Sequence, residues 1–158
     1  MQRVNGMMVT TTLLIALIFQ LYPWSGNGII LRPDFLLIVT LYWVLRTPNL
    51  CNVGMAWLAG LLVDLSTGSL LGQHALSFAF TAYLGLAYQR RLVLFNKLQL
   101  AVYVLLLLII SRVIVLVLKL FEGNEGPGWS YFWPIITSLI LWQAMVLVFG
   151  APTRPSRQ

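Results

Sequence analysis

An uninterrupted aliphatic run is the feature of this sequence that most limits its fold. The letters VLLLLII, from Val104 to Ile110, lie inside a longer apolar segment at residues 98–121. A strand of a membrane barrel would alternate polar and apolar residues, and this run does not alternate. A helix of about 20 apolar residues crosses the roughly 30 Å of bilayer hydrocarbon. The run therefore predicts a membrane-spanning α-helix.

The composition extends this prediction to the whole chain. Hydrophobic residues make up 59% and charged residues 9% of the 158 residues, whereas soluble domains carry about 25% charged residues. Apolar segments recur with no linker or low-complexity block between them. We therefore expect an all-α polytopic membrane protein, with six transmembrane helices in one bundle and a single transmembrane domain over residues 1–158. The expected spans are residues 7–22, 33–45, 53–71, 74–88, 98–121 and 131–149.

The distribution of charge predicts how the spans are oriented. Cytoplasmic loops of membrane proteins are enriched in Lys and Arg. With six spans, alternate segments share a side, and one side collects most of the basic residues of this chain, whose net charge is +6. We therefore expect a multi-pass inner-membrane (cytoplasmic-membrane) protein with an uncleaved first span and both termini cytoplasmic. The residues expected on the cytoplasmic side are Arg3, Arg46, Arg90, Arg91, Lys97, Arg154 and Arg157.

The opposite side is expected to carry the acidic residues outside the spans. It collects Arg32, Asp34, Glu122 and Glu125, with Lys119 at the edge of a span. Aromatic residues near the ends of spans are expected to lie at the level of the lipid headgroups. These are Tyr22, Trp24, Tyr42, Trp43, Tyr88, Trp129, Tyr131 and Trp133.

Two charged residues fall inside predicted spans, where a charge is costly and therefore informative. At about 1.5 Å per residue, Asp64 lies about 16 Å and Arg112 about 21 Å from the cytoplasmic ends of their spans. We expect them to form an ion pair, or to share a polar network with Ser66, Thr67 and Ser111. A pair that locks two helices is favoured. The alternatives are a pair that shapes a partner-binding cavity, and a proton or ion pathway.

Small residues recur at every fourth position of the third predicted span. In a continuous helix they share one narrow face with Asp64, which lets another backbone approach closely. Packing within the bundle is favoured over an interface between molecules. Because Gly68 and Gly72 lie at the end of the span, a turn there is as plausible as a helix interface. This helix-packing face consists of Ala56, Gly60, Gly68 and Gly72.

Further polar residues lie near the outer ends of predicted spans. The lone His74 is expected to cap a helix or lie at the interface, because it has no neighbours at metal-ligand spacing. Asp34 suits a helix N-terminus, and Arg32 can extend to the headgroups. The single cysteine, Cys51, excludes an internal disulfide and a cysteine-based metal cluster. We expect no metal and no cofactor.

The sequence does not contain the motifs on which common enzyme classes depend. It has no glycine-rich phosphate loop, no HExxH and no GxSxG, and its four acidic residues offer little acid–base chemistry. Basic residues do not alternate with aromatic residues on a soluble face, so nucleic-acid binding is not expected. We therefore expect a protein that is not an enzyme.

Several short motifs follow one another in the first half of the chain. They are LRPDFLL from Leu31, LYW from Leu41, Pro48, NVG from Asn52, GLLVDL from Gly60 and SLLG from Ser69. In these motifs the chain resembles the MreD family, the rod shape-determining membrane proteins of bacteria. The resemblance covers roughly residues 10–150 and is most specific between residues 31 and 72.

This resemblance implies a non-enzymatic membrane scaffold of the bacterial elongation (Rod) complex, or elongasome, which maintains rod cell shape. Such proteins bind MreC and help to couple MreB filaments to peptidoglycan synthesis by RodA and its penicillin-binding transpeptidase partner. The family is similar in fold to the six-helix substrate-binding subunits of energy-coupling-factor vitamin transporters. That similarity implies a cavity on the outer side, near Arg32, Asp34, Asp64 and His74, which could take a segment of a partner.

Two other functions stay open at this point. The chain could be a small-molecule-binding membrane subunit of a vitamin-type importer, which would need several polar groups converging in the outer half of the bundle. It could also be an ion-coupled transporter, for which an internal repeat with broken helices would be expected. The sequence contains no convincing repeat.

Overall fold

The structure is a computed structural model that describes residues 6–23, 25–26, 31–92, 94–121, 123 and 128–152. These residues form helices and no strand, so the predicted all-α fold is confirmed for them. The expectations for Arg3, Trp24, Glu122, Glu125, Arg154 and Arg157 lie outside the described residues. The helices are α1 (Gly6–Leu21), α3 (Phe35–Arg46), α4 (Val53–Thr67), α5 (Gln73–Leu92), α6 (Lys97–Phe121), the short 3-10 helix η1 (Trp129–Phe132) and α7 (Trp133–Phe149).

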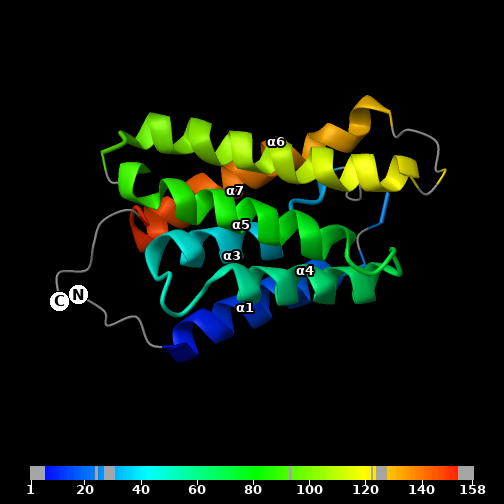
Figure 1. The fold of residues 1–158 in the computed structure, drawn as a ribbon, viewed down its shortest axis with the longest axis horizontal. Coiled ribbons are helices and arrows are strands. Elements are labelled where there is room, and N and C mark those ends of the chain that lie inside the picture. Colours follow the sequence, from blue (N-terminus) through cyan, green and yellow to red (C-terminus); the bar gives the residue numbers. More distant parts are fainter. Residues whose placement is uncertain are drawn as a thin grey trace.

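The long helices lie side by side along the long axis of the molecule and run in alternating directions (Figure 1). The start of α1 and the end of α7 therefore lie at the same end of the bundle, which we call the basal end. The turn from α4 to α5 and the start of α7 lie at the opposite end, which we call the hollow end for a reason given below. This alternation is what a six-span topology requires.

The helix ends differ from two of the predicted span boundaries, by four residues at the end of α4 and by two at the start of α3, for local reasons. The segment predicted at 53–71 ends as a helix at Thr67, because Gly68 adopts a left-handed conformation with φ +63° that ends α4. The segment predicted at 33–45 begins as a helix at Phe35, with Asp34 at its N-cap position and Pro33 outside. At its other end α4 begins at Val53, after the N-cap residue Asn52, whose side chain accepts a hydrogen bond from the Met55 N–H.

Among the described residues, two helical segments are long and apolar enough to cross a membrane. These are Lys97–Phe121 and Trp129–Phe149, while α1, α3 and α4 are apolar but shorter. Large apolar side chains also point outward from most helices, for example Leu14, Leu62, Phe80, Leu106 and Ile140. Soluble monomers rarely expose so much contiguous apolar surface. The helices are therefore compatible with a membrane protein, but the structure does not confirm six spans.

Helix α3 lies at the centre of the bundle. Every side chain from Leu36 to Leu45 is buried, and the helix packs against α1, α4, α5 and α7. Tyr42 and Trp43 are 0% and 1% exposed, so their side chains pack within the bundle and do not face its surroundings. The Trp43 indole instead donates to the Thr12 hydroxyl of α1 at 2.8 Å. Of the other predicted interface residues, the exposed ones are Tyr22, Tyr88, Trp129 and Trp133.

At the basal end, α3 and α7 finish at the same level. The Arg46 guanidinium donates to the Tyr42 hydroxyl and to the Phe149 carbonyl, the latter at 2.5 Å. The Tyr42 hydroxyl in turn donates to the Gly150 carbonyl at 2.9 Å. Arg46 thus satisfies a carbonyl at the end of α7 that has no partner within its own helix.

Because the basal ends are level, the shortness of α3 leaves a recess at the other end. Helix α3 has 12 residues, about 18 Å, whereas α6 has 25 residues, about 37 Å. The Asp34 N–H donates to the Ser138 hydroxyl at 3.0 Å, and Ser138 lies more than one turn inside the start of α7. The start of α3 therefore lies below the surrounding helix ends.

The single cysteine is a convenient internal probe of this fold. Cys51 lies in the turn between α3 and α4, is 0% exposed, and its thiol lies 3.9 Å from the Thr40 carbonyl. Burial raises the pKa of the Cys51 thiol to about 11. A thiol is reactive as the thiolate, so the folded protein is expected to resist thiol reagents at neutral pH.

Candidate functional site

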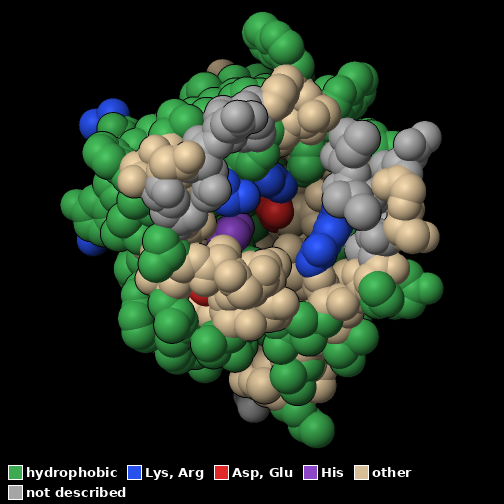
Figure 2. Space-filling model, turned by 90° about the vertical axis from the view of Figure 1, so that its right-hand side faces the viewer, with side chains coloured by type: hydrophobic (Ala, Val, Ile, Leu, Met, Phe, Trp, Pro, Cys, Tyr) green, Lys and Arg blue, Asp and Glu red, His purple; other side chains and the backbone are tan. Residues whose placement is uncertain are grey.

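The recess above α3 is a hollow lined by charged side chains. Figure 2 looks onto this end and shows Lys or Arg side chains, an acidic side chain and a histidine inside the hollow, with apolar side chains on the outer sides of the bundle. The chain has one histidine, so this side chain is His74. The hollow therefore combines residues that the sequence places far apart.

An ion pair between α6 and the start of α3 crosses the hollow. The Arg112 Nη2 lies 2.7 Å from the Asp34 Oδ2, and the two side chains are 16% and 19% exposed. The predicted pairing of Arg112 with Asp64 is therefore wrong. Because α3 starts deep in the bundle, Asp34 reaches the level of Arg112, which lies more than two turns before the end of α6.

Tyr131 holds two cations of α6 close together. Its ring centroid lies 5.2 Å from the Arg112 Cζ and 5.6 Å from the Lys119 Nζ, within the range of cation–π attraction. Its hydroxyl points to the Arg112 carbonyl at 3.4 Å. Arg32 precedes α3 and is half-buried. The hollow thus contains three cations among the described residues.

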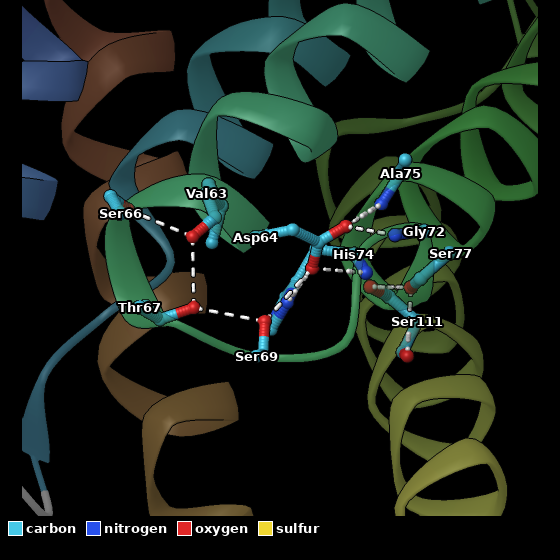
Figure 3. A network of polar contacts seen from close by, with 10 residues as sticks. All are labelled: Val63, Asp64, Ser66, Thr67, Ser69, Gly72, His74, Ala75, Ser77 and Ser111. Carbon is cyan, nitrogen blue, oxygen red and sulfur yellow. Dashed lines mark hydrogen bonds and ion pairs between the residues drawn. The ribbon is translucent and has the colours of Figure 1, made fainter.

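Asp64 lies beside the hollow and is fully buried, with its carboxylate facing the start of α5 (Figure 3). Its Oδ2 accepts hydrogen bonds from the N–H groups of Gly72 and Ala75 at 2.9 and 3.2 Å. Its Oδ1 accepts from the N–H of His74 at 3.0 Å and from the Ser69 hydroxyl at 3.1 Å, and lies 2.8 Å from His74 Nδ1. The first N–H groups of a helix have no partner within it, so Asp64 caps α5 from another helix.

The other residues of the predicted polar network are divided between two separate groups (Figure 3). The Thr67 hydroxyl lies 3.0 Å from that of Ser69, and so joins the Asp64 group. The Ser66 hydroxyl donates to the Val63 carbonyl of its own helix at 2.8 Å. Ser111 lies apart, with its hydroxyl 2.7 Å from that of Ser77, and this contact joins α5 to α6.

Of the predicted small-residue face, Ala56 and Gly60 lie in α4, and for Gly68 and Gly72 the structure selects the turn over the helix interface. Ala56 is buried, and Gly60 packs directly on the start of α5. A Cβ at Gly60 would lie 2.4 Å from the His74 carbonyl oxygen. Gly68 and Gly72 lie in the turn after α4, with φ +63° and +108°. The glycine spacing at the end of this segment therefore marks a turn, and the close approach is internal to the bundle.

The arrangement favours binding over catalysis. No group of three His, Cys, Asp or Glu side chains within the described ranges is placed to hold a metal ion. The Asp64 carboxylate faces donors on every side and is closed to solvent, so it has no open path to a substrate. The cations of the hollow are partly exposed and attract negatively charged groups.

Sequence reasoning missed three residues of the site. Lys119 was expected at the edge of a span and Tyr131 at headgroup level, and no role was predicted for Ser138. The spacing of Arg112 and Lys119, seven residues apart on one helix, was a usable signal, because such residues share a face. Nothing in the sequence indicated that Tyr131 lies between them.

Comparisons with known proteins agree on one family. A family model described as rod shape-determining protein MreD matches residues 1–150. A stretch of 70 residues is 43% identical to the rod shape-determining protein MreD of Haemophilus influenzae. This match covers 44% of the chain and 43% of that relative, which is less than half of its length. No solved structure matches the chain, so the expected similarity to energy-coupling-factor subunits stays a prediction.

Proposed function

Because the chain belongs to the MreD family of rod shape-determining proteins, we propose that it is a non-enzymatic membrane scaffold of the machinery that maintains rod cell shape. The observation that carries this proposal is the family match over residues 1–150. A bundle whose helices expose apolar side chains to their surroundings is the expected form of such a scaffold.

In this proposal all six long helices cross the membrane, with the basal end in the cytoplasm. The described basic residues at the basal end are Arg46, Arg90, Arg91 and Lys97, with no described acid among them. The hollow end carries both Asp34 and Asp64 together with its cations. An excess of Lys and Arg favours the cytoplasmic side. The hollow then faces the outside of the cell.

The proposed direct partner is MreC, and through the complex MreB, RodA and its penicillin-binding transpeptidase. The helix-packing face of α4 is excluded as the contact site, because Gly60 already packs on α5 and cannot receive another helix. We place the contact with a transmembrane helix of the partner on outward apolar surfaces. Leu62 and Leu65 of α4 are examples, at 47% and 61% exposed. Neither comparison favours the alternative of an importer subunit.

A pull-down of the tagged chain from its own cells, in mild detergent, tests this function. We expect mass spectrometry to identify MreC together with the elongation synthases. A tagged multi-pass membrane protein of unrelated function, expressed to the same level, is the control for partners that adhere to any apolar surface. Recovery of transporter ATPases without MreC would contradict the scaffold function and favour import.

A further inference from the structure

Among the described residues, the cations of the hollow outnumber its acids. Arg32, Arg112 and Lys119 face two described acids, Asp34 and Asp64. The Asp64 carboxylate is 0% exposed and is surrounded by donors from the turn after α4 and the start of α5. Its charge is therefore directed at the N-terminus of a helix. Of the two described acids, Asp34 is the one that faces the three cations.

Two of these cations also have buried donors without an acceptor. Arg112 reaches Asp34 through Nη2, but its Nε is buried and has no hydrogen-bond partner among the described residues. The Nε of Arg32 is in the same state. Buried polar groups are nearly always hydrogen-bonded, because leaving them unpaired is costly. Both guanidinium groups can therefore donate to a ligand that brings oxygen acceptors.

The position of the third cation adds to this attraction. Lys119 and Arg112 both lie against the ring of Tyr131, so two positive charges share one aromatic face. Like charges held close together repel each other. An anion between them lowers this repulsion while it satisfies the free donors.

We propose that the hollow binds a phosphate group, carried either by a lipid headgroup or by a free phosphate ion. A guanidinium presents its N–H groups in a planar fork that matches the oxygens of phosphate. The cations of the hollow suit the phosphate of a headgroup, and the apolar side chains on the outer sides of the bundle (Figure 2) suit the chains of a lipid. This inference goes beyond the proposed scaffold function and depends neither on MreC nor on which side the hollow faces.

The full chain, purified in an uncharged detergent, allows a direct test. Heat unfolding is followed through the labelling of the Cys51 thiol, which becomes reactive when the fold opens. The two probes are phosphatidylglycerol in mixed micelles and sodium phosphate at constant ionic strength. We expect at least one of them to raise the unfolding midpoint in a saturable way. Arg32→Gln should raise the half-saturating concentration roughly tenfold, the effect of losing one charge-assisted hydrogen bond.

A cation at the other end of the bundle provides the matched control. The Arg91 Cζ lies 6.0 Å from the ring of Tyr88, so Arg91, like Lys119, is a cation beside a tyrosine ring. Because Arg91 lies away from the hollow, Arg91→Gln should leave binding unchanged. If Arg32→Gln does not fold, Lys119→Gln replaces it with the same expectation. A response to the lipid alone assigns the phosphate to a headgroup. Competition by sodium phosphate assigns the site to the free ion, and both results support the proposal.

Three results would overturn it. In the first, neither probe shifts the midpoint of the wild-type chain. In the second, Arg91→Gln weakens binding as much as Arg32→Gln does, which would indicate a general effect of net charge. In the third, neither probe shifts the unfolding midpoint, and a protein that co-purifies with the wild-type chain is lost from Arg32→Gln. That result would assign the hollow to a segment of a protein.

Discussion

Replacing Asp64 with asparagine is expected to destabilise the fold by about 2–4 kcal/mol, because it removes acceptors from the buried start of α5. The carboxylate accepts from the N–H groups of Gly72, His74 and Ala75, and from the Ser69 hydroxyl. An amide has one acceptor oxygen, so its NH₂ group must face N–H donors on one side of the site. Asp64 and Ala75 are buried and the other three donors are half-buried, so the donors cannot all turn to water.

The measurement is the labelling of Cys51 as a function of temperature or denaturant in detergent. We expect the labelling transition of Asp64→Asn to move to milder conditions. The control is Ser66→Ala, two residues from the same acid, since Ser66 is exposed and donates within α4. That variant should stay close to the wild type. Equal stability of wild type and Asp64→Asn would show that α5 does not depend on this cap.

The second large effect is expected at Gly60, where Gly60→Ala should cost about 1–2 kcal/mol. A Cβ there would lie 2.4 Å from the His74 carbonyl oxygen and 2.5 Å from the Ala75 Cα. Both are backbone atoms, so α4 and α5 must move apart, and overpacking of this kind typically costs about 1–3 kcal/mol. The helix propensity gained by alanine, about 1 kcal/mol, offsets part of this loss.

Gly85→Ala is the matched control for this prediction. Gly85 lies inside α5, and a Cβ there would meet the Leu45 Cδ2 at 3.5 Å, an ordinary contact. We therefore expect Gly85→Ala to be neutral or slightly stabilising in the same Cys51 assay. If Gly60→Ala also proved neutral, the close approach of α4 and α5 would be absent from the protein in detergent.

Gly60 and Asp64 together explain how the hairpin of α4 and α5 is built. They lie one turn apart on the same face of α4, as the four-residue spacing predicts. Gly60 brings the start of α5 into backbone contact, and Asp64 then lies close enough to cap it. Loss of either residue is expected to loosen the same joint, so their effects should not be additive.

Local patterns predicted the helices well because each apolar run carries its own signal. The all-α fold and the approximate position of each long helix followed from hydropathy alone. The end of α4 did not, because apolar residues continue past Gly68 into the turn at Leu70 and Leu71. The left-handed conformation of Gly68, rather than a change in polarity, ends the helix.

The partners of the buried charges could not be predicted from depth alone. Asp64 and Arg112 were matched by their distance from the basal end, yet α5 packs against both α4 and α6 and lies between them. The short α3 also places Asp34 at the depth of Arg112, which no local pattern indicates. The pairing of Asp64 with His74 was within reach, since a ten-residue separation across a helical turn is local.

The most direct test of the proposed membrane scaffold is the side on which each turn of the chain lies. Single cysteines at exposed positions, namely Ser25, Leu50, Leu70, Asn96 and Trp129, sample the successive turns between the long helices. Intact cells, or spheroplasts where an outer membrane intervenes, are treated with a maleimide that cannot cross the inner membrane. The parent chain, with Cys51 buried, is the unlabelled control.

We expect the cysteines at 25, 70 and 129 to be labelled from outside, and those at 50 and 96 only after the membrane is permeabilised. This alternation would place the hollow outside the cell and the basal end in the cytoplasm. Labelling of two successive turns from the same side would mean that the helix between them does not cross the membrane. That result would contradict the six-span scaffold.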